Sequence, residues 1–156
     1  MLKKALLTLT CIAMATSALA KEVTIPTARG DVTLSAPPAK IAVFDTGSLD
    51  TLQALGVKVD GAADVAKLLP YLKPTLDSAK NVGTIFEPNL EALNELKPDL
   101  IIVGTRTAKK FDDVSAIAKT IDLTDNGNKL VESGIQRIDS FGRLFDKQAA
   151  ADKLKE

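Results

Sequence analysis

The stretch Asp99–Lys110 reads DLIIVGTRTAKK. Its centre is a run of large aliphatic residues that ends at Gly104. A continuous apolar run of this length, closed by a turn residue, is typical of a parallel strand that is buried on both faces. Residues with hydroxyl and cationic side chains follow directly after Gly104. Such side chains contribute nothing to the burial of a strand. The stretch therefore predicts a parallel strand whose carboxyl end faces either a helix cap or a ligand.

Similar strands recur along the chain, and helical patterns separate them. We expect strands at 40–44, 57–64, 81–83, 99–104 and 120–124, and helices at 48–55, 70–76, 88–96, 111–119 and 128–145. Before them, the alternating runs on either side of Arg29-Gly30-Asp31 predict an N-terminal β-hairpin that ends at Pro37-Pro38. This order predicts the α/β class, with a mostly parallel doubly wound sheet and helices on both of its faces.

Local signals refine three of the helices. Ser48 is positioned to cap the helix that follows it, and Gly56 to end that helix. Pro88 is expected in the first turn of the next long helix, where its missing N–H costs nothing. The apolar spacing of the longest helix predicts buried side chains at Leu130, Ile135, Ile138, Phe141 and Phe145.

The composition excludes several classes of function. The 156 residues carry 20 basic and 20 acidic side chains, so nothing favours binding to nucleic acid, which requires a basic surface. There is no histidine, which removes the usual general base and the commonest transition-metal ligand. No phosphate-binding glycine pattern follows the first strand of the sheet. The chain therefore lacks the common signatures of a hydrolase or a nucleotide-dependent enzyme.

The N-terminus has the pattern of a cleavable export signal. Residues 1–20 combine two lysines, an apolar segment and a small-x-small site ending at Ala20. The one cysteine, Cys11, lies inside this signal and lacks the context of a lipoprotein site. The mature chain would then have no thiol and no disulfide. The bacterial periplasm is the compartment that this pattern favours.

The C-terminal residues 147–156 consist of strong helix formers without a stop signal. A helix therefore begins as the sequence runs out, which suggests a fragment whose second half is missing. A terminal, solvated helix is the alternative.

The predicted strand ends supply the candidate ligand-binding residues. In open parallel sheets, ligands bind beyond the carboxyl ends of the strands. The residues collected there are Thr46, Gly47, Ser48, Lys67, Phe86, Thr105 and Arg106. Arg106 is the sharpest candidate, because its planar fork can hold a carboxylate or a pair of catecholate oxygens. Its alternatives are an ion pair with Asp112 or a helix cap, and Thr46 and Ser48 are as well explained by capping.

Two stretches resemble a known family. Residues 40–61 (KIAVFDTGSLDTLQALGVKVDG) and 82–124, with the motif EPNLEALNELKPDLII, are similar to periplasmic siderophore-binding proteins of ABC iron importers. These are class III substrate-binding proteins, and the GTRTAKKFDD tip resembles the subgroup that binds ferric catecholates, with Thr105 in place of a glycine. The resemblance extends from about Val23 to Phe145.

The resemblance implies two α/β lobes joined by one long helix, with the ligand between them. Residues 21–146 would be the N-terminal lobe, and 147–156 the start of the inter-lobe helix. Arg106 would contact the anionic oxygens of the Fe(III)-siderophore, and Glu91 would dock onto the inner-membrane ABC permease. On physical grounds alone, Glu91 is a solvated acid in the first turn of a helix, where the dipole favours it.

The resemblance also implies a monomer that binds no metal through its own side chains and holds no covalent cofactor. A related protein that binds haem, cobalamin or a hydroxamate siderophore is the alternative within the same class. An α/β enzyme domain is the alternative outside it, and the absence of histidine, and of cysteine after residue 20, counts against it.

Overall fold

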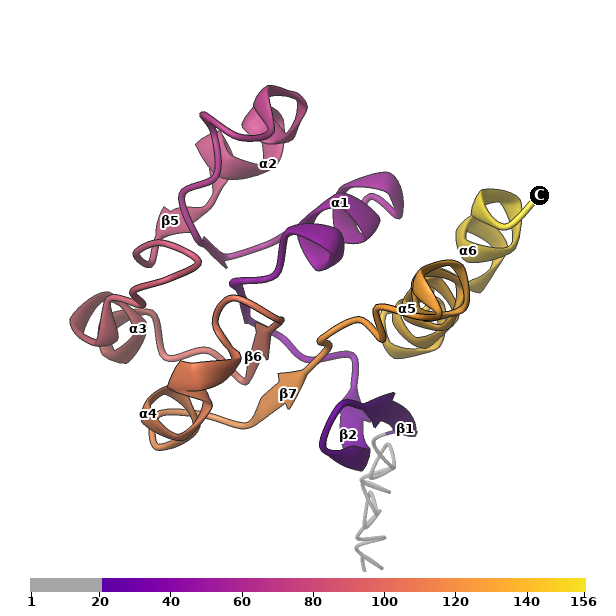
Figure 1. Cartoon of the computed structure of the whole chain (residues 1–156), viewed down its shortest axis with the longest axis horizontal. Helices are drawn as coiled ribbons and strands as arrows, with labels where there is room; N and C mark the ends of the chain where they lie inside the picture. Colours follow the sequence, from indigo (N-terminus) through magenta and orange to yellow (C-terminus); the bar gives the residue numbers. More distant parts are fainter. Residues whose placement is uncertain (1–20) are drawn as a thin grey trace, which may run out of the picture.

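A parallel sheet of five strands forms the centre of the computed structural model, which describes residues 21–156 (Figure 1). The strands stand in the order β5-β4-β3-β6-β7, and each neighbouring pair is parallel. Their bounds are β3 Ile41–Val43, β4 Gly61–Ala62, β5 Lys80–Asn81, β6 Leu100–Val103 and β7 Thr120–Asp122. The predicted α/β class and parallel sheet are confirmed. The strands are shorter than predicted, because residues such as 57–60 lead from a helix to the sheet and pair only from Gly61 onward.

Helices lie on both sides of this sheet, as the sequence predicts. Two of the helices, α1 and α5, lie on one side, and α3 and α4 lie on the other (Figure 1). The helix α6 packs against α5. The bounds are α1 Thr46–Ala54, α2 Lys73–Ser78, α3 Leu90–Leu96, α4 Phe111–Ser115, α5 Leu130–Leu144 and α6 Gln148–Leu154, with the 3₁₀ turns η1 Pro70–Leu72 and η2 Ala108–Lys110.

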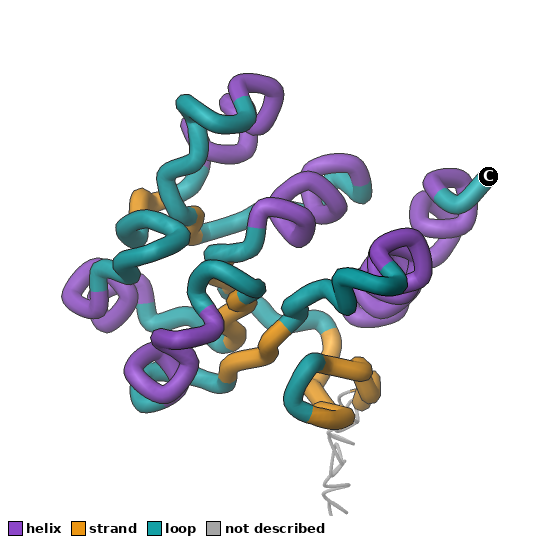
Figure 2. The backbone as a smooth tube through the Cα atoms, in the orientation of Figure 1, coloured by secondary structure: helices purple, strands orange, loops and turns teal. Residues whose placement is uncertain are grey.

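The predicted hairpin is present and forms a sheet of its own. Strand β1 (Lys21–Thr27) pairs antiparallel with β2 (Gly30–Ala36), and both lie beside α5 (Figure 2). Arg29 in the turn fixes the hairpin to the parallel sheet. Its Nε donates to Asp122 Oδ2 at 3.0 Å, and its guanidinium lies 4.0 Å from the ring centroid of Phe111. The hairpin is thereby held against the loops that leave the sheet.

The structure corrects two helix starts. Asp45, not Ser48, caps α1: it has an extended backbone, and its carboxylate accepts the N–H of Ser48 at 2.7 Å. A carboxylate at this position satisfies a free N–H and also complements the helix dipole. Likewise Pro88 lies before α3 and not inside it, because Asn89 takes the cap position and accepts the N–H of Ala92.

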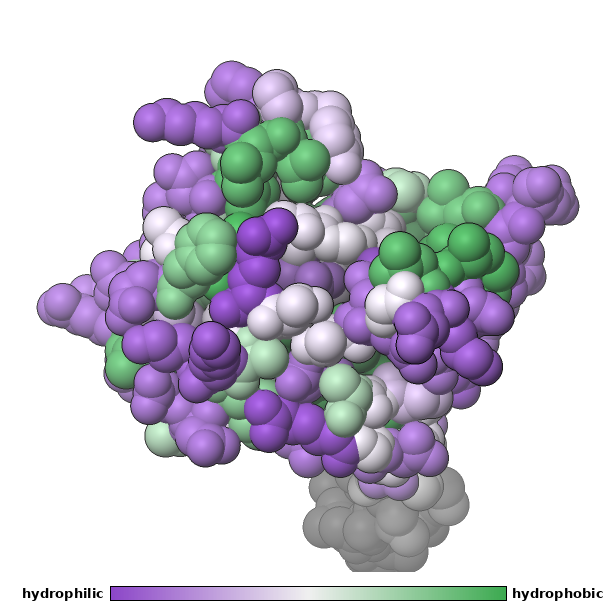
Figure 3. Space-filling view, viewed as in Figure 1, coloured by the Kyte–Doolittle hydropathy of each residue, from purple (hydrophilic) through white to green (hydrophobic). Residues whose placement is uncertain are grey.

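The burial predicted along the longest helix is only partly right. Phe141 is fully buried, and Ile138 and Phe145 are half-buried. Leu130 and Ile135 remain 61% and 47% exposed, so these two predictions are wrong. The apolar periodicity of α5 extends over the whole helix, but Leu130, Val131 and Ile135 near its start have no covering element in the described chain. Figure 3 shows apolar surface in the region of α5 and α6.

The strand order creates one position where the chain reverses direction across the sheet. From β3 the chain moves outward through β4 to β5, and it then returns to place β6 on the other side of β3. The loops that leave β3 and β6 therefore turn to opposite sides, which opens a crevice at the carboxyl ends of these two strands. Such a reversal is where open α/β sheets bind their ligands.

The predicted signal peptide, residues 1–20, lies outside the described residues. Within residues 21–156, no helix is both long and apolar enough to span a membrane. Residues 147–156 contain α6, so the predicted terminal helix is present. Its role as the start of an inter-lobe helix stays a prediction.

Candidate ligand-binding site

A pocket of about 500 Å³ lies at the crevice between β3 and β6. The loop after β3 supplies Phe44 and Asp45, the first turn of α1 supplies Thr46 and Gly47, and the loop after β6 supplies Gly104, Thr105 and Arg106. Ile85 and Asp125 complete the lining. The structure thus brings Thr46, Gly47, Thr105 and Arg106, four of the residues proposed from the sequence, into one pocket.

Arg106 is the cation that lines this pocket. Its side chain is exposed, and within residues 21–156 it forms no ion pair, with Asp112 or with any other carboxylate. The guanidinium lies 5.7 Å from the ring centroid of Phe86, within the range of a cation–π contact. Its five donors are consequently free for an anion that enters the pocket.

Phe86 stands next to the pocket on the loop between β5 and α3, with 60% of its surface exposed. Thr107 connects this loop to the loop of Arg106. The Thr107 side chain is fully buried, and its hydroxyl donates to the carbonyl of Ile85 at 2.5 Å. A second link is the ion pair between Lys110 and Glu87, at 3.2 Å. The aromatic ring and the cation are thus held beside each other by contacts between their loops.

Three of the proposed residues do not line the pocket: Phe86, which stands beside it, Ser48 and Lys67. The hydroxyl of Ser48 is fully buried and donates to Asp45 Oδ2 at 2.7 Å, so it supports the helix cap. Lys67 is exposed on the loop after β4 and is absent from the pocket lining. Glu91 is exposed in the first turn of α3, as expected, and forms no ion pair within residues 21–156.

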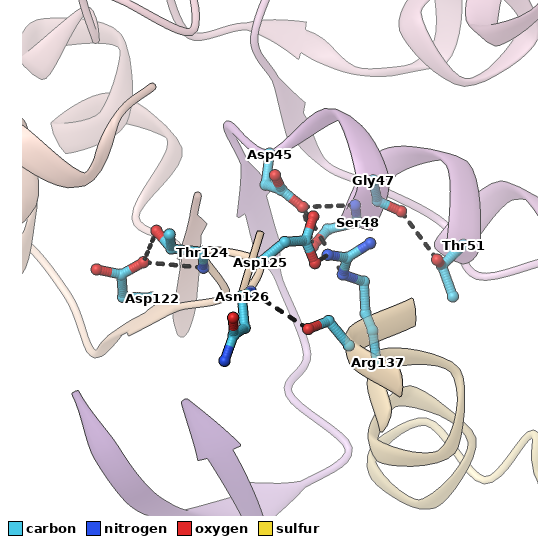
Figure 4. Close-up of polar contacts among 10 residues, drawn as sticks. Asp45, Gly47, Ser48, Thr51, Asp122, Thr124, Asp125, Asn126 and Arg137 are labelled. Atoms are coloured by element: carbon cyan, nitrogen blue, oxygen red, sulfur yellow. Dashed lines mark hydrogen bonds and ion pairs between the residues drawn. The ribbon is translucent and has the colours of Figure 1, made fainter. Parts of the chain in front are cut away.

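Three charged residues of the site were not proposed from the sequence as ligand-binding residues, although Asp45 stands at the end of the first predicted strand of the sheet. Asp45 and Asp125 both line the pocket, and Arg137 of α5 lies directly behind them (Figure 4). The Nη2 of Arg137 donates a hydrogen bond to Asp125. The Nε of Arg137 lies 3.9 Å from Asp45 Oδ2. Arg137 is only 9% exposed. An arginine inside an amphipathic helix signals a solvated surface, so the sequence contained no indication that this one is buried.

The described residues contain no group of three or more Asp, Glu, His or Cys side chains arranged to hold a metal ion. The pocket instead combines two carboxylates, hydroxyl groups and the Arg106 guanidinium, which is unpaired within residues 21–156, and the ring of Phe86 lies beside it. Such a set can bind an anionic, partly aromatic molecule through charge-assisted hydrogen bonds and stacking. A metal that arrives already surrounded by the oxygens of its own chelator needs no further ligands from the protein.

Residues 41–156 match the model of the periplasmic binding protein family, and the chain therefore belongs to that family. Members of this family are substrate-binding proteins. The particular relatives of the chain refine this assignment.

Three relatives illustrate the similarity. The chain is 39% identical over 121 residues to the petrobactin-binding protein YclQ of Bacillus subtilis (strain 168). This match covers 76% of this chain and 37% of YclQ. It is 31% identical over 141 residues to the Fe(3+) dicitrate-binding periplasmic protein FecB of Escherichia coli (strain K12). This match covers 85% of this chain and 47% of FecB. The crystal structure of the periplasmic catecholate-siderophore binding protein VctP from Vibrio cholerae superposes with a TM-score of 0.78 at 30% identity, covering 86% and 49%. The chain spans less than half the length of these relatives.

Proposed function

We propose that this chain is the N-terminal lobe of a periplasmic solute-binding protein that captures a ferric siderophore, of the catecholate type, and delivers it to an inner-membrane ABC permease. The family and the named ligands of the relatives support this role. The observation that carries it is the guanidinium of Arg106, which has no ion-pair partner within residues 21–156, in a pocket where the sheet reverses its strand order. The proposal assigns the chain a binding role, as a monomer, and no catalytic one.

The chemistry of such a ligand matches the pocket. A ferric tris-catecholate carries several negative charges, and its iron is already held by hard oxygen donors. A binding protein therefore needs cations and hydroxyl donors rather than metal ligands. Arg106 supplies the cation, Thr46 and Thr105 supply hydroxyls, and the exposed ring of Phe86 can stack on a catechol ring. The Ile85–Thr107 contact keeps the ring and the cation on the same side of the pocket.

A ferric citrate complex is the second candidate ligand, because FecB, a relative that covers most of this chain, is a dicitrate-binding protein. Citrate is anionic and has no aromatic ring. Replacing Phe86 by alanine should therefore weaken the binding of a catecholate complex and leave the binding of ferric citrate unchanged. The two candidates are separated by titrating both complexes into the same Phe86→Ala protein.

The direct test is a calorimetric titration of the whole mature protein with a ferric tris-catecholate. Arg106→Ala should weaken binding by about 1.5–3 kcal/mol, the range for losing a hydrogen bond to a charged group. Arg106→Lys should lose less, because the charge remains while the planar fork is gone. Arg143→Ala is the matched control, because Arg143 lies on α5 and pairs with Asp139 at 3.3 Å. An unchanged affinity in Arg106→Ala would remove Arg106 from the site and leave the proposal without its main support.

A further inference from the structure

Arg137 reaches the ligand pocket from behind. It comes from α5, whereas the two carboxylates that it meets stand on the loops after β3 and β7 (Figure 4). Arg137 does not line the pocket itself, but Asp45 and Asp125 do. Their side chains are 13% and 35% exposed, compared with 9% for Arg137. The guanidinium is thus a buried charge whose counter-charges form part of the pocket wall.

The position of Arg137 also explains a residue of the pocket. A side chain at position 47 would place its Cβ in collision with Nη1 of Arg137. Gly47 therefore allows the guanidinium to lie directly against the backbone of the turn that begins α1. The contact with Asp125 is a hydrogen bond, whereas Nε has no hydrogen-bond partner within residues 21–156 and faces Asp45 at 3.9 Å. Arg137 is consequently fixed by Asp125 and attracts Asp45 mainly through its charge.

The formal charges at the pocket show what this arrangement achieves. Asp45, Asp125 and Arg106 line the pocket, and their two negative charges and one positive charge leave a net formal charge of −1. An anionic ligand would meet a net repulsion there, because potentials in a concave site are focused by its low-dielectric walls. Including Arg137 brings the sum to zero. The pocket can then present the free guanidinium of Arg106 without opposition from the carboxylates.

We propose that Arg137 is a positioning residue that determines the charge specificity of the pocket: by binding Asp125 and neutralising Asp45 from behind, it enables the pocket to accept an anionic ligand. This inference rests on the proposed function as far as the ligand is concerned. It concerns a residue that never touches that ligand, and it makes the charge of the ligand, rather than its shape, the property that Arg137 controls.

The first test compares two ferric complexes of different charge in the whole mature protein: a ferric tris-catecholate, which is strongly anionic, and a ferric tris-hydroxamate, whose core is neutral. Asp125→Asn removes a negative charge but keeps an Oδ1 that can accept the hydrogen bond from Arg137, and it changes the summed formal charge of the pocket from zero to +1. We expect this variant to bind the tris-catecholate about three- to tenfold more tightly at low ionic strength, and the gain to shrink in high salt. Its affinity for the tris-hydroxamate should change less than twofold.

Arg137→Met tests the same idea in the opposite direction. We expect it to weaken binding of the tris-catecholate about five- to tenfold at low ionic strength, and Asp125→Asn in the Arg137→Met protein to recover most of the loss. Asp125→Asn should not rescue Arg106→Ala to a comparable extent, because that variant lacks the group that touches the ligand. A purely structural role for Arg137 predicts that both complexes lose affinity equally and that removing the Asp125 charge restores neither. That result, or an Asp125→Asn variant whose affinity for the anion is unchanged, would overturn the proposal.

A measurement without siderophore separates this inference from the proposed function. Paramagnetic co-solutes, one anionic and one neutral, broaden backbone amide signals by an amount that depends on their local concentration. The ratio of the two effects at Thr46 and Thr105 therefore reports the local electrostatic potential. It should shift toward the anion in Asp125→Asn and away from it in Arg137→Met, if Arg137→Met folds. If the wild-type protein binds no ferric complex but these ratios shift as described, the proposed function fails and the role of Arg137 stands. Unchanged ratios in Asp125→Asn refute the role of Arg137.

Discussion

The hydroxyl of Thr107 donates a hydrogen bond to the carbonyl oxygen of Ile85 over 2.5 Å, and both residues are buried. This contact joins the loop that carries Arg106 to the loop that carries Phe86. Neither loop contains a strand residue at that point, so the relative position of Arg106 and Phe86, the two proposed ligand-binding side chains, depends on a side-chain contact. The pair therefore supports the site: Ile85 lines the pocket, whereas Thr107 lies behind it.

Replacing Thr107 by valine removes the hydroxyl and keeps the shape of the side chain. The Ile85 carbonyl then loses its partner, and we expect the free energy of unfolding to fall by about 1–3 kcal/mol, the cost of leaving a buried polar group unpaired. Urea unfolding measures this change. Thr107→Ser retains the hydroxyl and should keep the hydrogen bond. Equal unfolding midpoints for the valine variant and the wild type would show that the contact contributes nothing.

Gly47→Ala tests the close approach of Arg137 to the α1 turn. The added Cβ would collide with Nη1, so either the guanidinium or the turn must move. Overpacking of this kind typically costs about 1–3 kcal/mol of stability. Gly127→Ala is the matched control, because its Cβ would have no neighbour within 4 Å. The cost should be smaller in an Arg137→Met background, and a cost independent of residue 137 would contradict the packing described here.

We expect the folding stability to depend on pH through Asp139, which lies at the junction of α5 and α6. The pKa of Asp139 is lowered from its ordinary value of 3.8, first by a hydrogen bond from Lys155 and then by contacts with Gln148 and Arg143. A lowered pKa in the folded state adds stability that is fully present above pH 3.8 and is lost as the pH falls through the folded pKa. Asp139 is 41% exposed, so solvent screening keeps this contribution below about 1 kcal/mol. Thermal melts between pH 5 and pH 2 should therefore show a shallower acid-side decline for Asp139→Asn, and parallel curves would disprove the linkage.

Glu91 tests the delivery step separately from capture. It is an exposed residue of α3 outside the pocket lining, so Glu91→Ala should leave ligand affinity unchanged. We expect the variant to slow iron uptake in cells, because the carboxylate is proposed to contact the permease. Glu95→Ala is the control, because Glu95 is a nearby glutamate already paired with Lys80 at 2.5 Å. The docking role would be refuted if iron uptake stayed normal in Glu91→Ala and also in a protein that lacks both Glu91 and the corresponding glutamate of a second lobe.

The sequence predicted the fold well because its strongest signals are local. The buried run at 100–103 and the helical patterns between such runs follow directly from hydrophobic periodicity. Strand order is different, because it depends on which strands pair across the chain. The pairing of β3 with β6, which creates the pocket, was not predicted from the sequence and is seen in the structure.

The residues of the candidate site show the same limit: local signals are read from the sequence, and contacts between distant residues are not. Arg106 was identified because it directly follows a buried strand, and the structure places it in the pocket. Arg137 is separated from Asp45 by more than ninety residues, and only tertiary packing brings them to 3.9 Å. Ser48 illustrates the opposite error: serine and aspartate are both good caps, and the sequence alone does not decide which of two neighbouring caps is used.

The most direct test of the account is the position of the iron in a crystal of the whole mature protein soaked with a ferric tris-catecholate, located by anomalous scattering. The account predicts iron in front of the carboxyl ends of β3 and β6, with catecholate oxygens within hydrogen-bond distance of the Arg106 guanidinium. Iron at the opposite end of the sheet, or a bound complex from which Arg106 points away, would contradict it.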